Sequence, residues 1–301
     1  MRSDLIFGVA VLALAAAGTA EAASVDIRHA AARVTVIPEN RADVKVEFVT
    51  TNAALPLQVE RRGDRVVVDG DLKRRIRNCH SRRWGNDEDG RSEGEAGVNV
   101  TVRGVGKVAW KDLPQVVVRT PMNAKVEASG AVFGSVGRSA SLELDNAGCG
   151  DWTIANVAGP ALVDIAGSGD TRMGASRQLR LRIAGSGDVE ATHVAGPANI
   201  DIAGSGDVHL ASIAGRLDVD IAGSGDVKVD GGRASEVDVN IAGSGDVHFG
   251  GAAQSLSASI AGSGDVHAGS VSGHVSKSVL GSGSVYVNGQ EIRNRRDHED
   301  N

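Results

Sequence analysis

Apolar and polar residues alternate in short runs through the second half of the chain. In residues 217–221 three aliphatic side chains alternate with two aspartates, and in residues 227–229 two valines flank Lys228. A period of two places the aliphatic side chains on one side of a β-strand and the charged ones on the other. Glycines separate the two runs, so the pattern predicts two short strands that meet at a corner. A third short side follows in most units, where an aliphatic residue precedes a second glycine by two positions, as at Val194 and Gly196.

The corner itself recurs at a nearly constant interval. The tetrad Gly-Ser-Gly-Asp begins at Gly167, Gly185, Gly204, Gly223, Gly243 and Gly262, with the variants Gly148-Cys149-Gly150-Asp151 before it and Gly281-Ser282-Gly283-Ser284 after it. This regular, short interval is typical of a solenoid in which each unit forms one coil. Two glycines in nearly every corner exclude helical repeats, and the single Gly-Asp corner of each unit excludes a calcium-binding nonapeptide roll.

The sequence therefore predicts an all-β fold, a right-handed parallel β-helix with coils of about 19 residues. Residues 121–287 form the repeats, including a degenerate coil near residues 128–130. Stacked coils would place equivalent aliphatic residues in two interior ladders. One ladder comprises Ile165, Ile183, Ile202, Ile221, Ile241, Ile260 and Val279, and the other comprises Val189, Val208, Val227, Val247, Val266 and Val285.

Outside the repeats, three segments have a different character. Residues 24–120 carry strand-like alternation and are expected to form a β-rich region that caps or extends the helix. Residues 73–95 interrupt that region with a basic cluster followed by an acidic one, which predicts a charged surface insertion. Residues 288–301 are almost wholly polar, which predicts a disordered charged tail that keeps the last coil from pairing with another molecule and favours a monomer.

The first 22 residues are typical of a signal peptide. An apolar run follows Arg2, and Ala20-Glu21-Ala22 fits a cleavage site. Export to the periplasm or the cell surface follows from this interpretation, with a retained membrane anchor as the alternative. No later segment is apolar enough for a membrane-spanning helix. Because exported proteins are oxidised, Cys79 and Cys149 either form a disulfide that ties the insertion to the first coils or remain as two thiols.

Charge patterns suggest candidate chemistry without deciding it. The tetrad aspartates form an outward ladder of Asp151, Asp170, Asp188, Asp207, Asp226, Asp246 and Asp265. Their mutual repulsion is relieved either by solvent and the backbone N–H groups of the next corner or by a row of weakly held Ca²⁺ ions. His209, His248 and His267 share that face and raise a Zn²⁺ or Ni²⁺ alternative, although Lys228 interrupts their row.

Three sets of residues are candidates for catalysis. The carboxylate pairs Asp218 with Asp238 and Asp201 with Asp220 resemble acidic pairs of polysaccharide-acting β-helices, and Arg77, His80 and Arg83 form a candidate centre with Asp151. Aromatic residues that would form sugar platforms make up 3% of the chain, and no nucleophile motif is present. The sequence thus favours a protein without catalytic residues or a cofactor.

The repeated Ile-Ala-Gly-Ser-Gly-Asp-Val units, together with the signal peptide, resemble the auto-transporter adhesin family with the head GIN domain. The resemblance is specific over 121–287 and weaker over 24–120. It implies a β-helix of the bacterial cell envelope with an adhesin-like role, and it supplies no catalytic residues. This chain has no segment after the repeats for a translocating barrel, so the resemblance does not extend to self-export.

The interpretation is a non-catalytic, exported cell-envelope protein, either an adhesin-like binding module or a structural module, with an unknown protein or envelope polymer as its partner. The charged insertion is a candidate recognition element. A net charge of −6 disfavours nucleic acid as a partner. The alternatives are a polysaccharide-acting enzyme on the same scaffold and a weak Ca²⁺-binding repeat protein.

Overall fold

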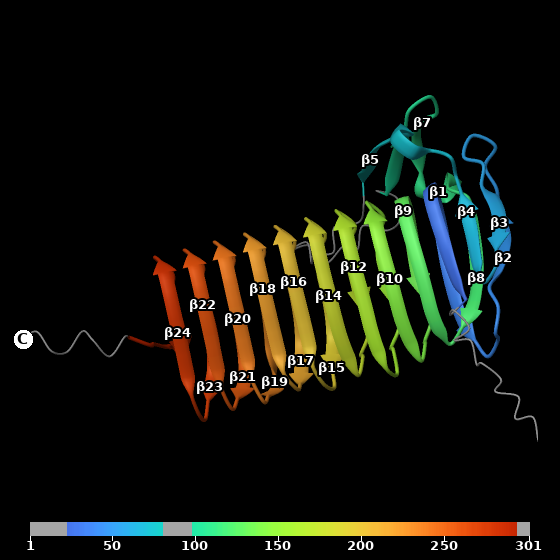
Figure 1. Ribbon diagram of the computed structural model, residues 1–301. Coiled ribbons are helices and arrows are strands. Elements are labelled where there is room, and N and C mark those ends of the chain that lie inside the picture. The colour runs from blue at the N-terminus through green and yellow to red at the C-terminus, as the bar shows by residue number, and fades with distance from the viewer. Residues whose placement is uncertain (1–22, 81–97, 294–301) are drawn as a thin grey trace, which may run out of the picture.

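The protein is an elongated parallel β-solenoid with a small lobe on one side of its N-terminal end (Figure 1). The computed structural model describes residues 23–80 and 98–293. The predicted signal peptide, most of the predicted charged insertion and the end of the tail lie outside these residues. The predicted fold class is confirmed, because equivalent strands of successive repeats pair in parallel along the whole repeat region.

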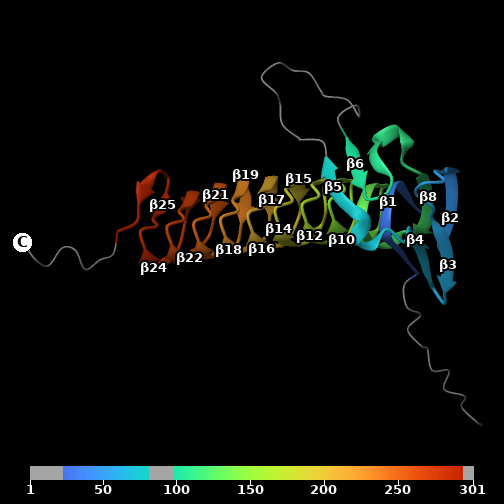
Figure 2. The same cartoon turned by 90° about the horizontal axis from the view of Figure 1, so that it is seen from above.

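Two long sheets form the sides of the solenoid. The first sheet contains β10 (Ser141–Gly148), β12 (Pro160–Gly167), β14 (Gln178–Gly185), β16 (Ala198–Gly204), β18 (Leu217–Gly223), β20 (Val237–Gly243), β22 (Leu256–Gly262) and β24 (Val275–Gly281). The second contains β11 (Trp152–Ile154), β13 (Thr171–Met173), β15 (Val189–Val194), β17 (Val208–Ala214), β19 (Val227–Ala234), β21 (Val247–Ala253), β23 (Val266–Val271) and β25 (Val285–Val287). Figure 2 shows the two rows of strands from above.

In the coils that contain β15 to β23, the third side is the second half of the strand in the second sheet. In β17, Leu210 and Ile213 are both buried, whereas Ala211 and Ser212 between them face outward. With two consecutive outward residues, the alternation of inward and outward side chains shifts by one position, and the strand bends there. Its pairing with β15 and β19 continues on both sides of the bend. The predicted three-sided coil is therefore present, with one of its corners inside a strand.

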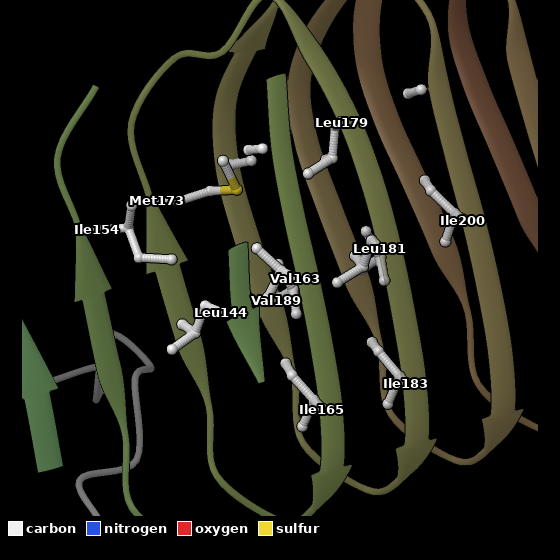
Figure 3. Close-up of a cluster of buried hydrophobic side chains, with 14 of the residues drawn as sticks. Leu144, Ile154, Val163, Ile165, Met173, Leu179, Leu181, Ile183, Val189 and Ile200 are labelled. Atoms are coloured by element: carbon white, nitrogen blue, oxygen red, sulfur yellow. The ribbon is translucent and has the colours of Figure 1, made fainter. Parts of the chain in front are cut away.

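The interior contains the two predicted ladders beside further rows of buried aliphatic side chains. Ile165 pairs with Ile183, Ile183 with Ile202, and the series continues to Val279, while the valine ladder runs in register from Val189 to Val285. Figure 3 shows Ile165 and Ile183 on neighbouring strands, with Leu144, Val163 and Leu181 in adjacent rows. A single coil is too thin to bury its aliphatic side chains alone, and they become buried only when coils stack. This burial is the main stabilising term of the solenoid.

Glycine is required at the corners by the spacing between coils. Gly223 has φ of +146°, and a Cβ there would lie 2.0 Å from the carbonyl oxygen of Gly204 in the preceding coil. Any side chain would force two coils apart along the backbone. The tetrad is therefore a packing requirement that recurs once per coil.

The solenoid begins at Ser24, so the predicted boundary at residue 121 is not where the coils start. The long strands β1 (Ser24–Glu39) and β9 (Asn123–Val136) each run through a complete coil and pair in parallel with each other. Beyond β1 lie β4 (Arg65–Asp69) in one sheet and β8 (Gln115–Pro121) in the other. Strands β3 (Gln58–Arg62) and β2 (Lys45–Thr50) pair antiparallel with these and cap the end. Residues 24–120 thus extend and cap the helix, as predicted.

The lobe is formed by the chain between β4 and β8. It contains the 3₁₀ helix η1 (Lys73–Arg75), a three-stranded antiparallel sheet of β5 (Ile76–His80), β6 (Asn99–Val102) and β7 (Gly106–Ala109), and the 3₁₀ helix η3 (Trp110–Asp112). Its small apolar core, which includes Val100 and Leu113, packs on Ala131 and Phe133 of β9. A disulfide joins Cys79 of β5 to Cys149 at a coil corner, with the two Cα atoms 5.9 Å apart. The lobe is therefore attached to the solenoid by both packing and a covalent bond.

The start of the predicted disordered tail is ordered, which corrects the expectation for residues 288–291. Asn288 and Gly289 have φ of +51° and +73°, and β26 (Gln290–Glu291) pairs antiparallel with β25. Asn-Gly is the preferred two-residue turn of a β-hairpin, because both positions need positive φ. The polar composition of the tail favoured disorder, and the Asn288-Gly289 turn was not recognised in it.

Candidate functional site

A long groove lies on the outer face of the first sheet. It crosses the strands from β10 to β22 and has a volume of about 790 Å³. Its floor is a row of exposed alanines, one on each strand, whereas the residue before each alanine, an isoleucine from β12 to β22, points into the interior. The alanines are Ala147, Ala166, Ala184, Ala203, Ala222, Ala242 and Ala261. Because strands lie about 4.8 Å apart, six spacings give a groove about 29 Å long.

One edge of the groove comes from a difference in side-chain length between two neighbouring rows. The alanine side chains end at Cβ, whereas the next outward row carries Asp145, Asp164, Arg182, Asp201, Asp220, Asn240 and Ser259. The longer row stands above the alanine row and forms a rim. The result is an apolar channel with a polar edge along one side.

The rim is acidic overall, with four carboxylates and one guanidinium. Nη1 of Arg182 lies 4.0 Å from Oδ1 of Asp164, and its Nε lies 3.5 Å from Oδ2 of Asp201. Asp220 accepts a hydrogen bond of 2.9 Å from the side-chain amide of Asn240. A single cation among four acidic groups leaves the rim with an excess of negative charge.

The carboxylates are most crowded at the β10 end of the groove. Burial first, and then the negative charges of Asp164, Glu143 and Glu127, raise the pKa of Asp145 to about 6. Oδ1 of Asp164 is buried and has no hydrogen-bond donor within the described part of the chain. Asp145 therefore binds a proton more readily than an exposed aspartate does.

The tetrad aspartates lie at the corners, outside this groove, and bind the backbone of the next coil. Oδ1 of each aspartate accepts a hydrogen bond of 2.7 to 3.1 Å from the backbone N–H of the equivalent residue in the next coil. The series joins Asp151, Asp170, Asp188, Asp207, Asp226, Asp246 and Asp265 and ends on Ser284. Burial raises the pKa of Asp170. Residues 23–80 and 98–293 contain no group of three or more ligand side chains placed to hold a metal ion. Ca²⁺ binding along this ladder stays a prediction.

The histidines of the same face have other partners. Nε2 of His209 lies 2.7 Å from Oδ2 of Asp230, and this hydrogen bond lowers the pKa of Asp230. The rings of His267 and Tyr286 are stacked with centroids 4.5 Å apart, and His248 lies 6.1 Å from His267. The row is thus partly an aromatic stack.

The candidate catalytic pairs are held in salt bridges or hydrogen bonds. Arg216 contacts Asp218 at 2.8 Å, Asp238 at 3.2 Å and also Glu236. The hydrogen bond to Asp218 is the main reason that the pKa of Arg216 is raised. Asp201 and Asp220 lie on the groove rim with the partners described above.

The predicted centre around Asp151 stays a prediction. Arg77 and His80 are exposed on β5, Asp151 is 8% exposed at a corner, and Arg83 lies outside the described residues. The groove, in contrast, was missed from the sequence. Its signal was present as the alanine that recurs before each tetrad, but alternation alone does not show that a row of small residues beside a row of long ones forms a channel.

Comparison with known proteins shows that part of the coil region matches a family model. Residues 156–270 and 195–291 match the family model described as "Putative auto-transporter adhesin, head GIN domain". Residues 156–291 match the head GIN family. The groove extends over this head GIN region from β12 to β22 and continues beyond it only at β10.

A solved structure shares the fold beyond the head GIN region. A protein from Parabacteroides distasonis, named "Putative lipid binding protein", has a TM-score of 0.53 and 17% identity to this chain. The similarity covers 89% of this chain and 93% of that one, so the capped N-terminal coils belong to the common architecture as well. No curated protein matches the chain. Within the described residues, no helix is long and apolar enough to cross a bilayer.

Proposed function

We propose that this protein is an exported, non-catalytic binding protein of the cell envelope, and that its groove holds an extended, mainly apolar ligand that carries a positive charge. The observation that carries the proposal is the continuous alanine floor beside an acidic rim. A channel about 29 Å long and open along its length fits a linear chain better than a compact molecule. Burial of apolar ligand surface against the alanine side chains would supply most of the binding free energy.

The charge of the ligand follows from the rim. Asp145, Asp164, Asp201 and Asp220 outnumber Arg182, so an anionic chain would be repelled and a cationic group would be attracted. The name of the Parabacteroides distasonis protein points in the same direction for the apolar part, since an acyl chain is one linear apolar ligand. The signal-peptide-like N-terminus and the match to the head GIN family support an envelope location. We expect the protein to be a monomer.

The test uses two amphiphiles with the same tail and opposite charge. Dodecylammonium and dodecanoate, both below their micelle concentrations, are titrated by calorimetry into the protein and into the variant Ala222→Phe. The phenyl ring fills the middle of the groove without adding charge. The matched control is Lys228→Phe, which places the same ring at an exposed position of β19 in the other sheet.

We expect dodecylammonium to bind more tightly than dodecanoate by at least tenfold, and Ala222→Phe to weaken it by a similar factor while Lys228→Phe does not. Equal binding of the two amphiphiles would refute the role of the acidic rim. Binding that Ala222→Phe leaves unchanged would refute the groove as the site.

A further inference from the structure

A second cavity lies where the lobe covers the outer face of the second sheet, about 300 Å³ in volume. Its floor is formed by outward side chains of neighbouring strands, because Gln115 of β8, Arg33 of β1 and Phe133 of β9 are in register. Its wall is formed by Val98 and by Trp110 of η3. The disulfide between β5 and the coil corner holds the lobe in this place.

Two residues that line this cavity, Arg33 and Trp110, each carry a buried hydrogen-bond donor without an acceptor within residues 23–80 and 98–293. Nε of Arg33 and Nε1 of Trp110 are both buried, and neither has a partner among the described residues. Buried donors are normally paired, since an unpaired one loses its hydration without compensation. Two such donors on one cavity therefore indicate a ligand that supplies acceptor oxygens.

The charge of Arg33 also has no ion-pair partner within the described residues. The guanidinium lies 5.7 Å from the centre of the Trp110 ring, and its Nη2 donates to the carbonyl of Leu113 at 3.4 Å. None of the ion pairs formed within residues 23–80 and 98–293 includes Arg33. A half-buried guanidinium without a carboxylate partner is a typical site for a planar anionic group such as a carboxylate.

One carboxylate, that of Asp151, is among the side chains that line the cavity. Its Oδ1 accepts the backbone N–H of Asp170 at 3.1 Å, so this group is already held by the neighbouring coil corner. A bound anion would be repelled by it and attracted by Arg33, which favours a ligand whose negative charge lies at one end.

The rest of the cavity is suited to a hydroxylated ring. Hydroxyl groups of Thr35, Ser135 and Thr153 line it beside the aromatic edges of Trp110 and Phe133, whose rings meet edge to face at 5.2 Å. Aromatic faces contact the apolar side of a sugar ring, and hydroxyls exchange hydrogen bonds with its edge. We propose that this cavity binds a sugar acid of the hexuronate type, with its carboxylate on Arg33 and a ring oxygen on the indole N–H of Trp110. This site is independent of the groove and of its ligand.

The experiment is a calorimetric titration of the full chain with D-galacturonate, with glucose as the neutral ring of similar size. A hydrogen bond to a charged group contributes about 1.5–3 kcal/mol, or roughly tenfold or more in affinity. We expect galacturonate to bind at least tenfold more tightly than glucose, and Arg33→Gln to remove that difference. The matched control, Arg180→Gln, exchanges an exposed arginine of β14 and should leave the affinity unchanged.

A second measurement keeps the proposal testable if Arg33→Gln does not fold. The indole N–H resonance of Trp110, assigned by its loss in Trp110→Phe, should shift during the galacturonate titration of the unaltered protein. Trp110→Phe should bind several-fold more weakly, because it retains an aromatic ring and loses the donor. Oligogalacturonides separate the two sources of the same chemistry: equal affinity assigns a free sugar acid, and higher affinity assigns the end of a polymer. Failure of both the monosaccharide and the oligomers to bind, or equal binding of glucose, would overturn the proposal.

Discussion

The crowded carboxylates at the β10 end of the groove make the stability of this protein depend on one aspartate. The change to test is Asp145→Asn, which removes the charge and keeps the shape of the side chain. In the folded protein the pKa of Asp145 is raised from 3.8 to about 6. The folded state therefore holds this proton more tightly than the unfolded state does, so stability is lost as the pH rises from about 4 through about 6.

The magnitude follows from the size of the shift and the position of the group. At about 1.4 kcal/mol per pH unit, the full shift corresponds to about 3 kcal/mol. Asp145 is only half-buried, and screening by solvent reduces this to about 1 kcal/mol. An asparagine at this position also offers an N–H group near the buried, unpaired Oδ1 of Asp164. We expect Asp145→Asn to be more stable than the unaltered protein by about 1 kcal/mol at pH 7.5 and equal to it at pH 4.

Urea unfolding followed by circular dichroism at the two pH values measures this difference. Comparison of variant and parent at each pH cancels the titration of all other carboxylates. Asp201→Asn is the matched control, because that carboxylate has Arg182 beside it and its removal should give no gain in stability. A variant that is less stable than the parent at pH 7.5, or a difference that is the same at both pH values, would refute the reasoning.

Three further predictions concern the solenoid itself. Gly223→Ala should lower the free energy of unfolding, measured in urea, by about 3 kcal/mol or more, because its Cβ would meet a backbone carbonyl at a position with positive φ. Gly231→Ala is the control and should change stability little, because Gly231 has open space around it. Similar effects of the two substitutions would contradict the packing role of the corner. Replacing Cys79 and Cys149 by serine opens a 70-residue loop and should cost up to about 4 kcal/mol, and an unaltered urea midpoint would show that the lobe does not depend on the bond. If the tetrad aspartates bind Ca²⁺, the melting temperature should rise on addition of Ca²⁺ and fall with EDTA; a constant melting temperature would leave the backbone hydrogen bonds as their only role.

Much of the candidate chemistry could not be predicted from the sequence because it depends on residues that only the fold brings together. Arg216 holds Asp218 and Asp238 together, and only the stacking of β18 on β20 places both carboxylates within its reach. The cavity under the lobe joins Arg33 to Trp110 and Phe133, which lie far from it in the sequence. Neither set has a local pattern that marks it.

The amino-acid sequence by itself determined the coil. Alternation of aliphatic and polar residues, with one glycine tetrad in every coil from Gly148 onward, is a local pattern. Each of these coils repeats the contacts of the last, so the interior ladders follow from one unit. Only the tertiary structure decided the order of strands at the N-terminal end, where β1 stacks on β9 and the chain between them forms the outermost coil, the caps and the lobe. Those pairings are non-local and occur once, so no repetition in the sequence records them. The groove is a property of many coils in register, since a single alanine beside a single aspartate has no depth.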